Sequence, residues 1–234
     1  MADSNIKLDS AKSLSGITLL EHVPANKVAS LEKRCQWLEF AQDDDVIDLK
    51  DTTTDVYFII RGKLRVMNYV KEDQQIALAE IESGETFGEL SAIDQMVRSA
   101  RVTALEPCLL ASISGDEFRD LLLECPEASM ALLKRLTGLI RTLSTRVITM
   151  GSMTLHQRVY YELLRLSEPS TSEDGSWIIA NAPNHSEIAS WVGGEKQTVA
   201  DAIGGLAREG VIERKHKNLI IWDHARLQRL VNQQ

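Results

Sequence analysis

The chain has 234 residues, of which 44% are hydrophobic and 26% charged, a composition typical of one large globular domain or two small ones. Its net charge of −8 argues against a generally basic coat for nucleic acid. The first twenty residues lack a basic start followed by an apolar core, and no run approaches the roughly 18 apolar residues of a membrane span. We therefore expect a cytoplasmic protein without a signal peptide or a membrane contact.

Short β-rich runs occupy the first half of the chain. Two of them, Val56–Ile60 and Leu64–Met67, flank an Arg-Gly-Lys turn. Further runs follow at 76–79, 100–104 and 108–113. Strands this short, at this spacing and without helices between them, predict a small barrel or jelly roll. Ahead of the strands, residues 15–39 carry short helical patterns.

A glycine-rich loop interrupts this β region. Gly-Glu occurs at 84–85 and again at 88–89, and the pair Arg98-Ser99 follows. Closely spaced glycines let backbone N–H groups turn inward as an anion-binding nest. The Glu89 carboxylate only accepts hydrogen bonds and so suits a sugar hydroxyl, whereas the planar Arg98 fork suits a phosphate, with the Ser99 hydroxyl beside it. Together these groups describe a cyclic-nucleotide pocket; the alternative is a surface turn with an Arg–Glu ion pair.

Helical patterning begins at Asp116 and runs more continuously from Pro126. An apolar seam recurs along it at alternating spacings of three and four, at Leu133, Leu136, Ile140, Leu143, Val147 and Met150. This strict, narrow seam predicts a parallel coiled-coil dimer helix. The alternative is a helix packed on its own domain, whose apolar stripe would be wider.

The last third of the chain has the pattern of a winged helix-turn-helix. A helical pattern over 155–166 and a polar loop over 167–175 precede a β-rich run at 177–180. Two short helical patterns, beginning near Asn184 and Gln197, then flank a glycine turn, and a hairpin with a basic Arg-Lys-His-Lys turn follows. Gly151 and Ser152 weaken the preceding helix and predict a hinge over 149–154.

The expected fold is therefore α+β and has three parts. Residues 15–125 form a cyclic-nucleotide-binding β-roll (jelly roll), residues 126–150 a long dimerisation helix, and residues 151–234 a winged helix-turn-helix DNA-binding domain.

The second helix of the helix-turn-helix opens with Lys196 and Gln197. Lysine can donate to guanine, and glutamine can pair bidentately with adenine. Asp201 and Glu195 oppose DNA binding because both repel phosphate.

The charge of the whole motif is balanced, since residues 184–217 contain five basic and five acidic side chains. The basic wing compensates in part by offering contacts to the DNA backbone. The predicted DNA surface comprises His185, Lys196, Gln197, Thr198, Lys215 and Lys217.

The order of β-roll, Gly-Glu-x-x-Gly-Glu-Leu…Arg-Ser loop, long helix and winged helix-turn-helix resembles the catabolite activator (cyclic AMP receptor) and fumarate-nitrate regulator family of bacterial transcription regulators. The resemblance covers about residues 18–225. It implies a phosphate-binding cassette in which Glu89 binds the ribose hydroxyl, and Arg98 and Ser99 hold the cyclic phosphate. The cassette residues are Gly88, Glu89, Leu90, Arg98 and Ser99.

Two features depart from the family pattern. Cyclic AMP receptors usually carry two adjacent hydroxyl residues on the dimer helix, and the matching pair here is Leu143 and Ser144. Ser144 and the neighbouring Thr145 are the expected base contacts, and the choice between cyclic AMP and cyclic GMP stays open. The recognition helix reads Lys-Gln-Thr-Val-Ala-Asp where members of this type often have Arg-Glu-Thr-Val-x-Arg.

The resemblance implies a homodimeric regulator that takes cyclic AMP or cyclic GMP as allosteric ligand. Near-palindromic double-stranded DNA is the implied target, with RNA polymerase as a further partner. We expect no enzyme, because the chain has no Gly-x-Ser-x-Gly or His-Glu-x-x-His motif. The alternative is a cyclic-nucleotide-sensing interaction protein whose acidic winged helix binds a protein partner.

We expect no metal, haem or iron–sulfur cluster. The three cysteines are scattered at Cys35, Cys108 and Cys125, with no Cys-x-x-Cys spacing and no N-terminal cluster. Haem-binding family members use a histidine in the barrel, and His22 is the only histidine before residue 156.

Overall fold

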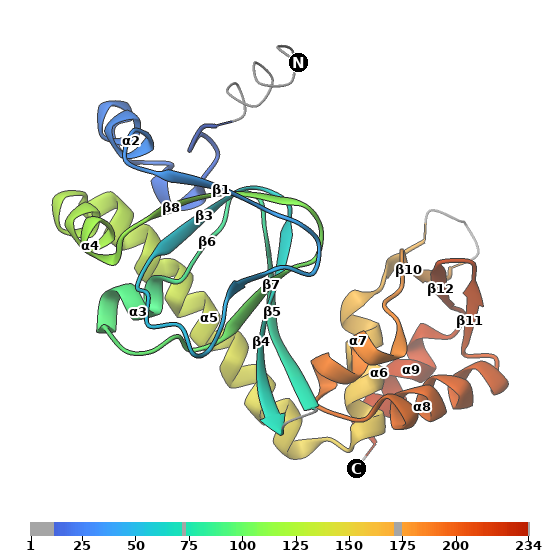
Figure 1. Ribbon diagram of the computed structural model, residues 1–234. Helices are drawn as coiled ribbons and strands as arrows, with labels where there is room; N and C mark the ends of the chain where they lie inside the picture. The colour runs from blue at the N-terminus through green and yellow to red at the C-terminus, as the bar shows by residue number, and fades with distance from the viewer. Residues whose placement is uncertain (1–11, 72–73, 171–174, 234) are drawn as a thin grey trace. The chain divides into compact units, whose positions relative to one another are not determined.

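The computed structural model of the protein describes residues 12–71, 74–170 and 175–233 (Figure 1). The chain divides into two compact units, one formed by Met1–Asn68 with Ala77–Ile140 and the other by Tyr69–Ile76 with Arg141–Gln234. Each unit has its own hydrophobic core. Among the described residues, no helix is both long enough and apolar enough to cross a membrane.

Within the described residues, the strands of the N-terminal half form two four-stranded sheets. The first sheet has the order β1 (Gln36–Phe40), β8 (Cys108–Ile113), β3 (Val56–Arg61) and β6 (Thr86–Phe87). The second has the order β2 (Asp45–Ile47), β7 (Arg101–Ala104), β4 (Lys63–Lys71) and β5 (Gln74–Glu82). The α+β fold with a β-roll, expected from the short β-rich runs, is confirmed.

Strand β1 lies where the sequence showed only helical patterns. Helix α2 ends at Glu32, and residues 36–40 pair antiparallel with β8 instead of continuing as helix. Pairing with a strand far along the chain determines the conformation of residues 36–40, because strand formation depends on neighbouring strands more than on local propensity.

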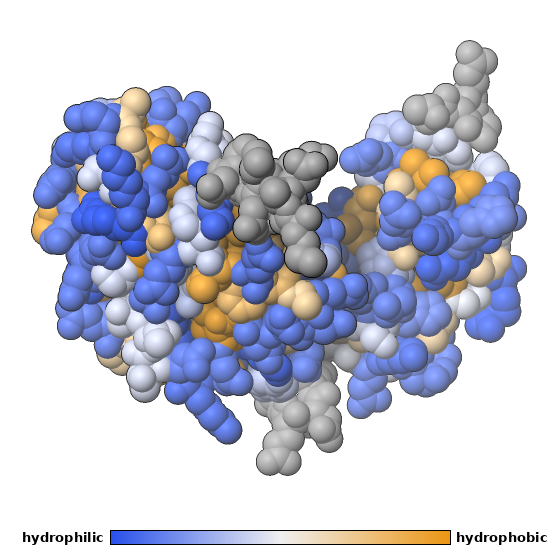
Figure 2. Space-filling view, turned by 45° about the horizontal axis from the view of Figure 1, so that its top comes forward, coloured by the Kyte–Doolittle hydropathy of each residue, from blue (hydrophilic) through white to orange (hydrophobic). Residues whose placement is uncertain are grey.

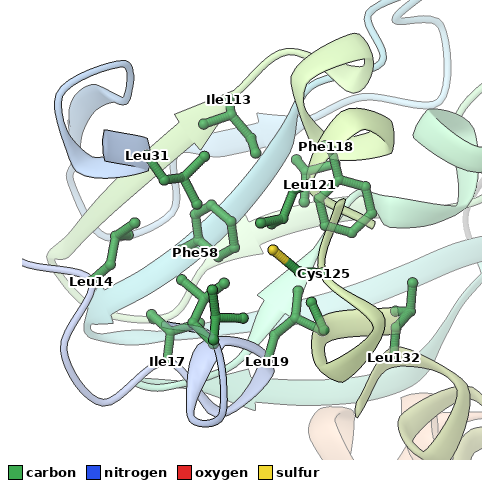
Figure 3. Packing of buried hydrophobic residues seen from close by; sticks show 14 of the residues in the cluster. Leu14, Ile17, Leu19, Leu31, Phe58, Ile113, Phe118, Leu121, Cys125 and Leu132 are labelled. Carbon is green, nitrogen blue, oxygen red and sulfur yellow. The ribbon is translucent and has the colours of Figure 1, made fainter. Parts of the chain in front are cut away.

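Strands β3 and β8 are apolar at most positions because both faces of their sheet are covered. On β3, Tyr57 and Ile59 point into the core between the two sheets, whereas Phe58 points to the opposite face. Figure 3 shows this second core, in which Phe58 lies among Leu31 of α2 (Ala25–Glu32) and Phe118 of α4 (Gly115–Glu124). The 3₁₀ turn η1 (Thr18–Leu20) contributes Leu19 and Leu20 to the same core.

Two further helices complete this half of the chain. The short α3 (Glu89–Asp94) follows β6, and α5 (Pro126–Ser152) runs for 27 residues. Helix α5 passes through Gly151 and Ser152, and Thr154 then caps the next helix with its side chain. The break therefore falls at 153–154, within the range where the sequence predicted a hinge.

The second unit has the expected winged helix-turn-helix. Its helices are α6 (Leu155–Leu166), α7 (His185–Val192), α8 (Lys196–Arg208) and α9 (His224–Asn232). Its sheet has the order β11 (Ile212–Lys215), β12 (Asn218–Ile221), β10 (Trp177–Ile179) and β9 (Glu168–Pro169). Asn184 begins α7 with a capping box, and Gly193 ends it with a left-handed backbone (φ +64°), which turns the chain toward α8.

The surface is mainly hydrophilic on the face drawn in Figure 2, where hydrophobic residues form patches among hydrophilic ones. Many large apolar side chains are buried in the three cores, among them Phe58, Ile59 and Leu110, whereas others, such as Ile140 and Val147 on α5, are exposed.

Replacing Phe58 by alanine should lower the free energy of unfolding by about 3–5 kcal/mol, because it leaves a cavity among side chains that cannot fully collapse into it. Urea denaturation followed by circular dichroism measures the change. Leu123→Ala is the control, since Leu123 is 82% exposed on α4 and its loss should matter by less than about 0.5 kcal/mol. Equal losses from the two variants would contradict this view of the core.

Candidate functional site

All five predicted cassette positions lie in the segment between β6 and β7, which contains α3. Gly88 precedes α3 with a left-handed backbone (φ +84°). A Cβ at this position would lie 2.7 Å from the Asp55 carbonyl oxygen and 3.0 Å from Nη1 of Arg98. Both the backbone angle and the lack of space therefore require glycine. Leu90 and Ser99 are exposed beside it.

Arg98 is only 3% exposed and ties this loop to the segment before β3. Its Nη1 donates to the Gly88 carbonyl (3.2 Å) and to Oγ of Ser91 (3.0 Å). Its Nη2 donates to Oγ1 of Thr53 (3.0 Å) and to the Asp55 carbonyl (3.0 Å). Burial lowers the pKa of Arg98 from its usual value, yet a guanidinium stays charged in proteins.

This arrangement differs from the sequence-based expectation, in which the Arg98 guanidinium is available to a phosphate. The two Nη atoms of Arg98 carry four hydrogens and donate to four protein oxygens, whereas its buried Nε has no hydrogen-bond partner among the residues the structure describes. For a bidentate contact, the phosphate would therefore accept from Nε and from one Nη atom, and that Nη atom would have to give up one of its protein acceptors. Nη2 shares an edge of the guanidinium with Nε and donates to Thr53 and Asp55, and of these two bonds the one to Thr53 is easier to exchange, because a side-chain hydroxyl can rotate away whereas the Asp55 carbonyl is fixed in the backbone.

Glu89 is also buried, at 4% exposure, and its Oε1 lies 3.1 Å from Nη1 of Arg135 on α5. The ion pair that forms is therefore Glu89–Arg135, and not the Glu89–Arg98 pair considered from the sequence. No sequence pattern indicated Arg135, because it lies outside the apolar seam and far from the loop along the chain. Thr53 and Asp55 were missed because they too lie far from the loop along the chain, whereas Ser91 lies within the loop itself.

The predicted base contacts Ser144 and Thr145 are exposed on the part of α5 that belongs to the second unit. Oγ1 of Thr145 donates to the Arg141 carbonyl (3.1 Å), which leaves the hydroxyl oxygen able to accept. The contact of these two residues with a nucleotide stays a prediction. Over residues 12–71, 74–170 and 175–233, no group of His, Cys, Asp and Glu side chains is placed to hold a metal ion.

The first turn of α8 carries the predicted base-reading residues. Lys196 and Gln197 are exposed, and Nε2 of Gln197 donates to Oδ1 of Asp201 one turn later (3.0 Å). Because a carboxylate only accepts, this bond fixes the amide nitrogen toward Asp201 and leaves the amide oxygen free. Gln197 can thus accept from a base amino group as it stands, and the second hydrogen of its Nε2 is left to donate, as bidentate pairing with adenine requires.

The other predicted DNA contacts lie on α7 (His185), on α8 (Thr198) and in the wing. His185 and Thr198 are half-buried, whereas Lys215 and Lys217 are exposed. Nζ of Lys215 lies 5.0 Å from the centre of the Trp222 ring and 3.5 Å from Oε2 of Glu213. The Lys215 ammonium group therefore already interacts with two side chains of the wing.

Two family models match the chain, the cyclic nucleotide-binding domain over residues 37–125 and the Crp-like helix-turn-helix domain over residues 157–230. The chain is 26% identical over 212 residues to the CRP-like cAMP-activated global transcriptional regulator of Mycobacterium tuberculosis, covering 90% of this chain and 95% of that one. It is 26% identical over 192 residues to the cAMP-activated global transcriptional regulator CRP of Haemophilus influenzae, covering 80% and 84%.

Solved structures share the fold. The c-di-GMP responsive global regulator CLP of Xanthomonas campestris superposes with a TM-score of 0.74 at 18% identity, over 85% of this chain and 99% of that one. A CooA mutant from Carboxydothermus hydrogenoformans superposes with a TM-score of 0.75 at 20% identity, over 91% and 95%.

A cyclic nucleotide-binding domain followed by a Crp-like helix-turn-helix defines a class of DNA-binding transcription regulators and not of enzymes. The chain belongs to the catabolite activator (cyclic AMP receptor) and fumarate-nitrate regulator family. The family expected from the loop and the domain order is thereby confirmed, as is a regulator in place of an enzyme.

Replacing Thr53 by valine should strengthen the binding of a cyclic nucleotide by about two- to tenfold. The change leaves one Nη hydrogen of Arg98 unpaired until the phosphate accepts it, and a net hydrogen bond is worth about 0.5–1.5 kcal/mol. Calorimetric titration with cyclic AMP and cyclic GMP measures the affinity. Thr52→Val is the matched control, because Thr52 is exposed and should leave the affinity unchanged. Weaker binding by Thr53→Val would show that this hydroxyl contacts the ligand itself.

Proposed function

We propose that the protein is a homodimeric transcription regulator whose binding to near-palindromic DNA is controlled by cyclic AMP or cyclic GMP at the Gly88–Ser99 loop. The observation that carries the proposal is the buried Arg98 guanidinium. Its four hydrogen-bond acceptors are a hydroxyl or carbonyl oxygen in every case, and none of them is charged. A buried cation without a contacting anion is costly, so a phosphate with its negative charge completes this site.

The ligand class follows from the other groups in the loop. The Glu89 carboxylate can accept from a ribose hydroxyl, and exposed Ser99 can donate to the same phosphate as Arg98. Curated relatives of the chain are described as cAMP-activated, which supports cyclic AMP. A structural neighbour is described as c-di-GMP responsive, so this dinucleotide belongs in the same titration.

The dimer is supported by the exposure of the apolar seam on α5. Leu133, Ile140 and Val147 are 56%, 64% and 71% exposed in the single chain. Large apolar residues that recur on one narrow stripe of a long helix are stabilised when a second helix covers them. We propose that the same helix of a second copy does so. Within the seam, Leu136 also packs in part against the core of its own chain.

The DNA target follows from the symmetry of such a dimer. Two copies of α8 entering successive major grooves require half-sites about one helical turn (roughly 34 Å) apart. Because DNA is the target, we propose that the protein acts in the cytoplasm, with RNA polymerase as a further partner. The second candidate, a nucleotide sensor whose winged helix binds a protein, rests on the five acidic residues that offset five basic ones over 184–217.

Binding to an operator duplex selected from a random pool tests the proposal. We expect fluorescence anisotropy to show tighter binding with cyclic AMP or cyclic GMP than without, and a steep loss of affinity as salt rises. Gln197→Ala should cost about 1–3 kcal/mol on the operator and relax the preference at one base pair per half-site. Lys217→Ala should weaken all duplexes about equally and flatten the salt dependence, since it removes a phosphate contact.

A scrambled duplex is the control for sequence reading. Equal losses from Gln197→Ala and Lys217→Ala on operator and scrambled DNA would show that α8 does not read sequence. The protein-partner function would then be favoured.

Replacing Leu143 by glutamate should break the dimer, because it sets a charge from each chain against its twin within the seam. Light scattering coupled to size-exclusion chromatography should report the mass of a monomer at low micromolar concentration. The neighbouring Thr142→Glu adds the same charge to an exposed position beside the seam and should leave the dimer intact. A Leu143→Glu protein that stays dimeric would place Leu143 outside the interface.

A further inference from the structure

The last turns of α5 are fastened to α7, the first helix of the helix-turn-helix, by Arg146. Its Nη2 donates to the carbonyl oxygen of Trp191 (2.6 Å), and its guanidinium carbon lies 5.5 Å from the centre of the Trp191 ring. Both residues belong to the second compact unit. One side chain thus holds the backbone and the ring of the same residue, by a hydrogen bond and by a cation–π contact.

Two further charged residues, Arg165 and Glu162, lie around the contact between Arg146 and Trp191. Arg165 of α6 lies 5.9 Å from the centre of the same ring and donates to both carboxylate oxygens of Glu162, at 2.9 and 2.6 Å. Glu162 is only 7% exposed. Burial lowers the pKa of Arg146, whereas the Glu162 charge acts in the opposite direction and favours the charged guanidinium.

A second arginine attaches to the next residue of α7. Nη1 of Arg158, on α6, donates to the carbonyl oxygen of Val192 (2.7 Å). Carbonyls in the last turn of a helix have no partner within that helix, and the negative end of the helix dipole favours cations. The two attachments have different origins: Arg158 comes from the helix-turn-helix domain itself, whereas Arg146 comes from α5.

We infer that Arg146 is the positioning residue through which the state of α5 is passed to the DNA-binding helices. The inference rests on the proposed function, since Ser144 and Thr145, the proposed nucleotide contacts, directly precede Arg146 on the same helix. A shift of α5 on nucleotide binding moves the guanidinium and, through Trp191, the end of α7. Gly193 joins that end to α8, so the recognition helix moves with it.

The coupling between nucleotide and DNA tests this inference. Operator affinity is measured by anisotropy with and without saturating cyclic AMP, or cyclic GMP if that nucleotide binds, and the ratio is the coupling factor. For the unmodified protein we expect a factor of roughly 5–150, and for Arg146→Ala a factor below about 3. The affinity of Arg146→Ala for the nucleotide in the absence of DNA should stay within about twofold of the unmodified value. Arg146→Lys keeps the charge but loses the planar fork and should fall between the two.

Arg141→Ala is the matched control, because it removes the same charge from an exposed position on the same helix and should keep the full coupling factor. A merely structural role of Arg146 would lower DNA affinity equally with and without nucleotide and so leave the factor unchanged. Thermal midpoints identify variants that fail to fold. If Arg146→Ala is one of them, Trp191→Leu, which removes the ring but keeps the carbonyl, should itself reduce the factor.

The outcomes separate this inference from the proposed function. An unmodified protein whose DNA affinity ignores every nucleotide tested would overturn both. Normal coupling in the unmodified protein that Arg146→Ala and Trp191→Leu both retain in full would overturn the inference alone. Loss of coupling in Arg146→Ala with retention in Arg141→Ala supports it, and the nucleotide affinity with and without DNA must then change by the same factor.

Discussion

The site on the β-roll depends on one constraint, the need to satisfy a guanidinium that is almost fully buried. Arg98 donates to oxygens of two segments that lie far apart in the sequence. One segment, before β3, supplies Thr53 and Asp55, and the other, around the start of α3, supplies Gly88 and Ser91. The left-handed backbone of Gly88 lets the two segments approach, because any Cβ there would meet the Asp55 carbonyl. Because none of these four acceptors is charged, the buried guanidinium supports the proposal that the loop binds an anion.

The two sheets make this convergence possible. Strand β3 is covered on both faces, so its path is fixed, and the segment that precedes it is held where Arg98 can reach it. Helix α5 then joins the loop through the Glu89–Arg135 pair. The same helix carries the exposed apolar seam, and further along it Arg146 holds α7. One helix thus supplies Arg135 to the proposed ligand site and Arg146 to the helix-turn-helix, and it carries the seam that we propose a second copy covers.

The helix-turn-helix shows how a family fold accommodates unusual charges. Asp201 stands where related regulators often have an arginine, and it is bonded to Gln197 within α8. The bond uses the amide nitrogen of Gln197 and leaves its amide oxygen able to accept, so the proposed DNA surface holds an acceptor beside the donors of Lys196. Membership of the family therefore fixes the architecture of the DNA surface but leaves its base preference to these individual residues.

The sequence by itself determined the features that depend on residues close together along the chain. Short β-rich runs, paired glycines, a seam with a three–four spacing and a glycine turn between two helices are local patterns, and each predicted its element and the order of the domains. Only the tertiary structure decided which distant residues meet. Strand β1 forms because β8 lies beside it, and Thr53, Asp55 and Arg135 join the ligand loop because the sheets and α5 bring them there. The same holds for Arg146 and Trp191, whose contact depends on how α5 and α7 pack and not on any spacing that a sequence can display.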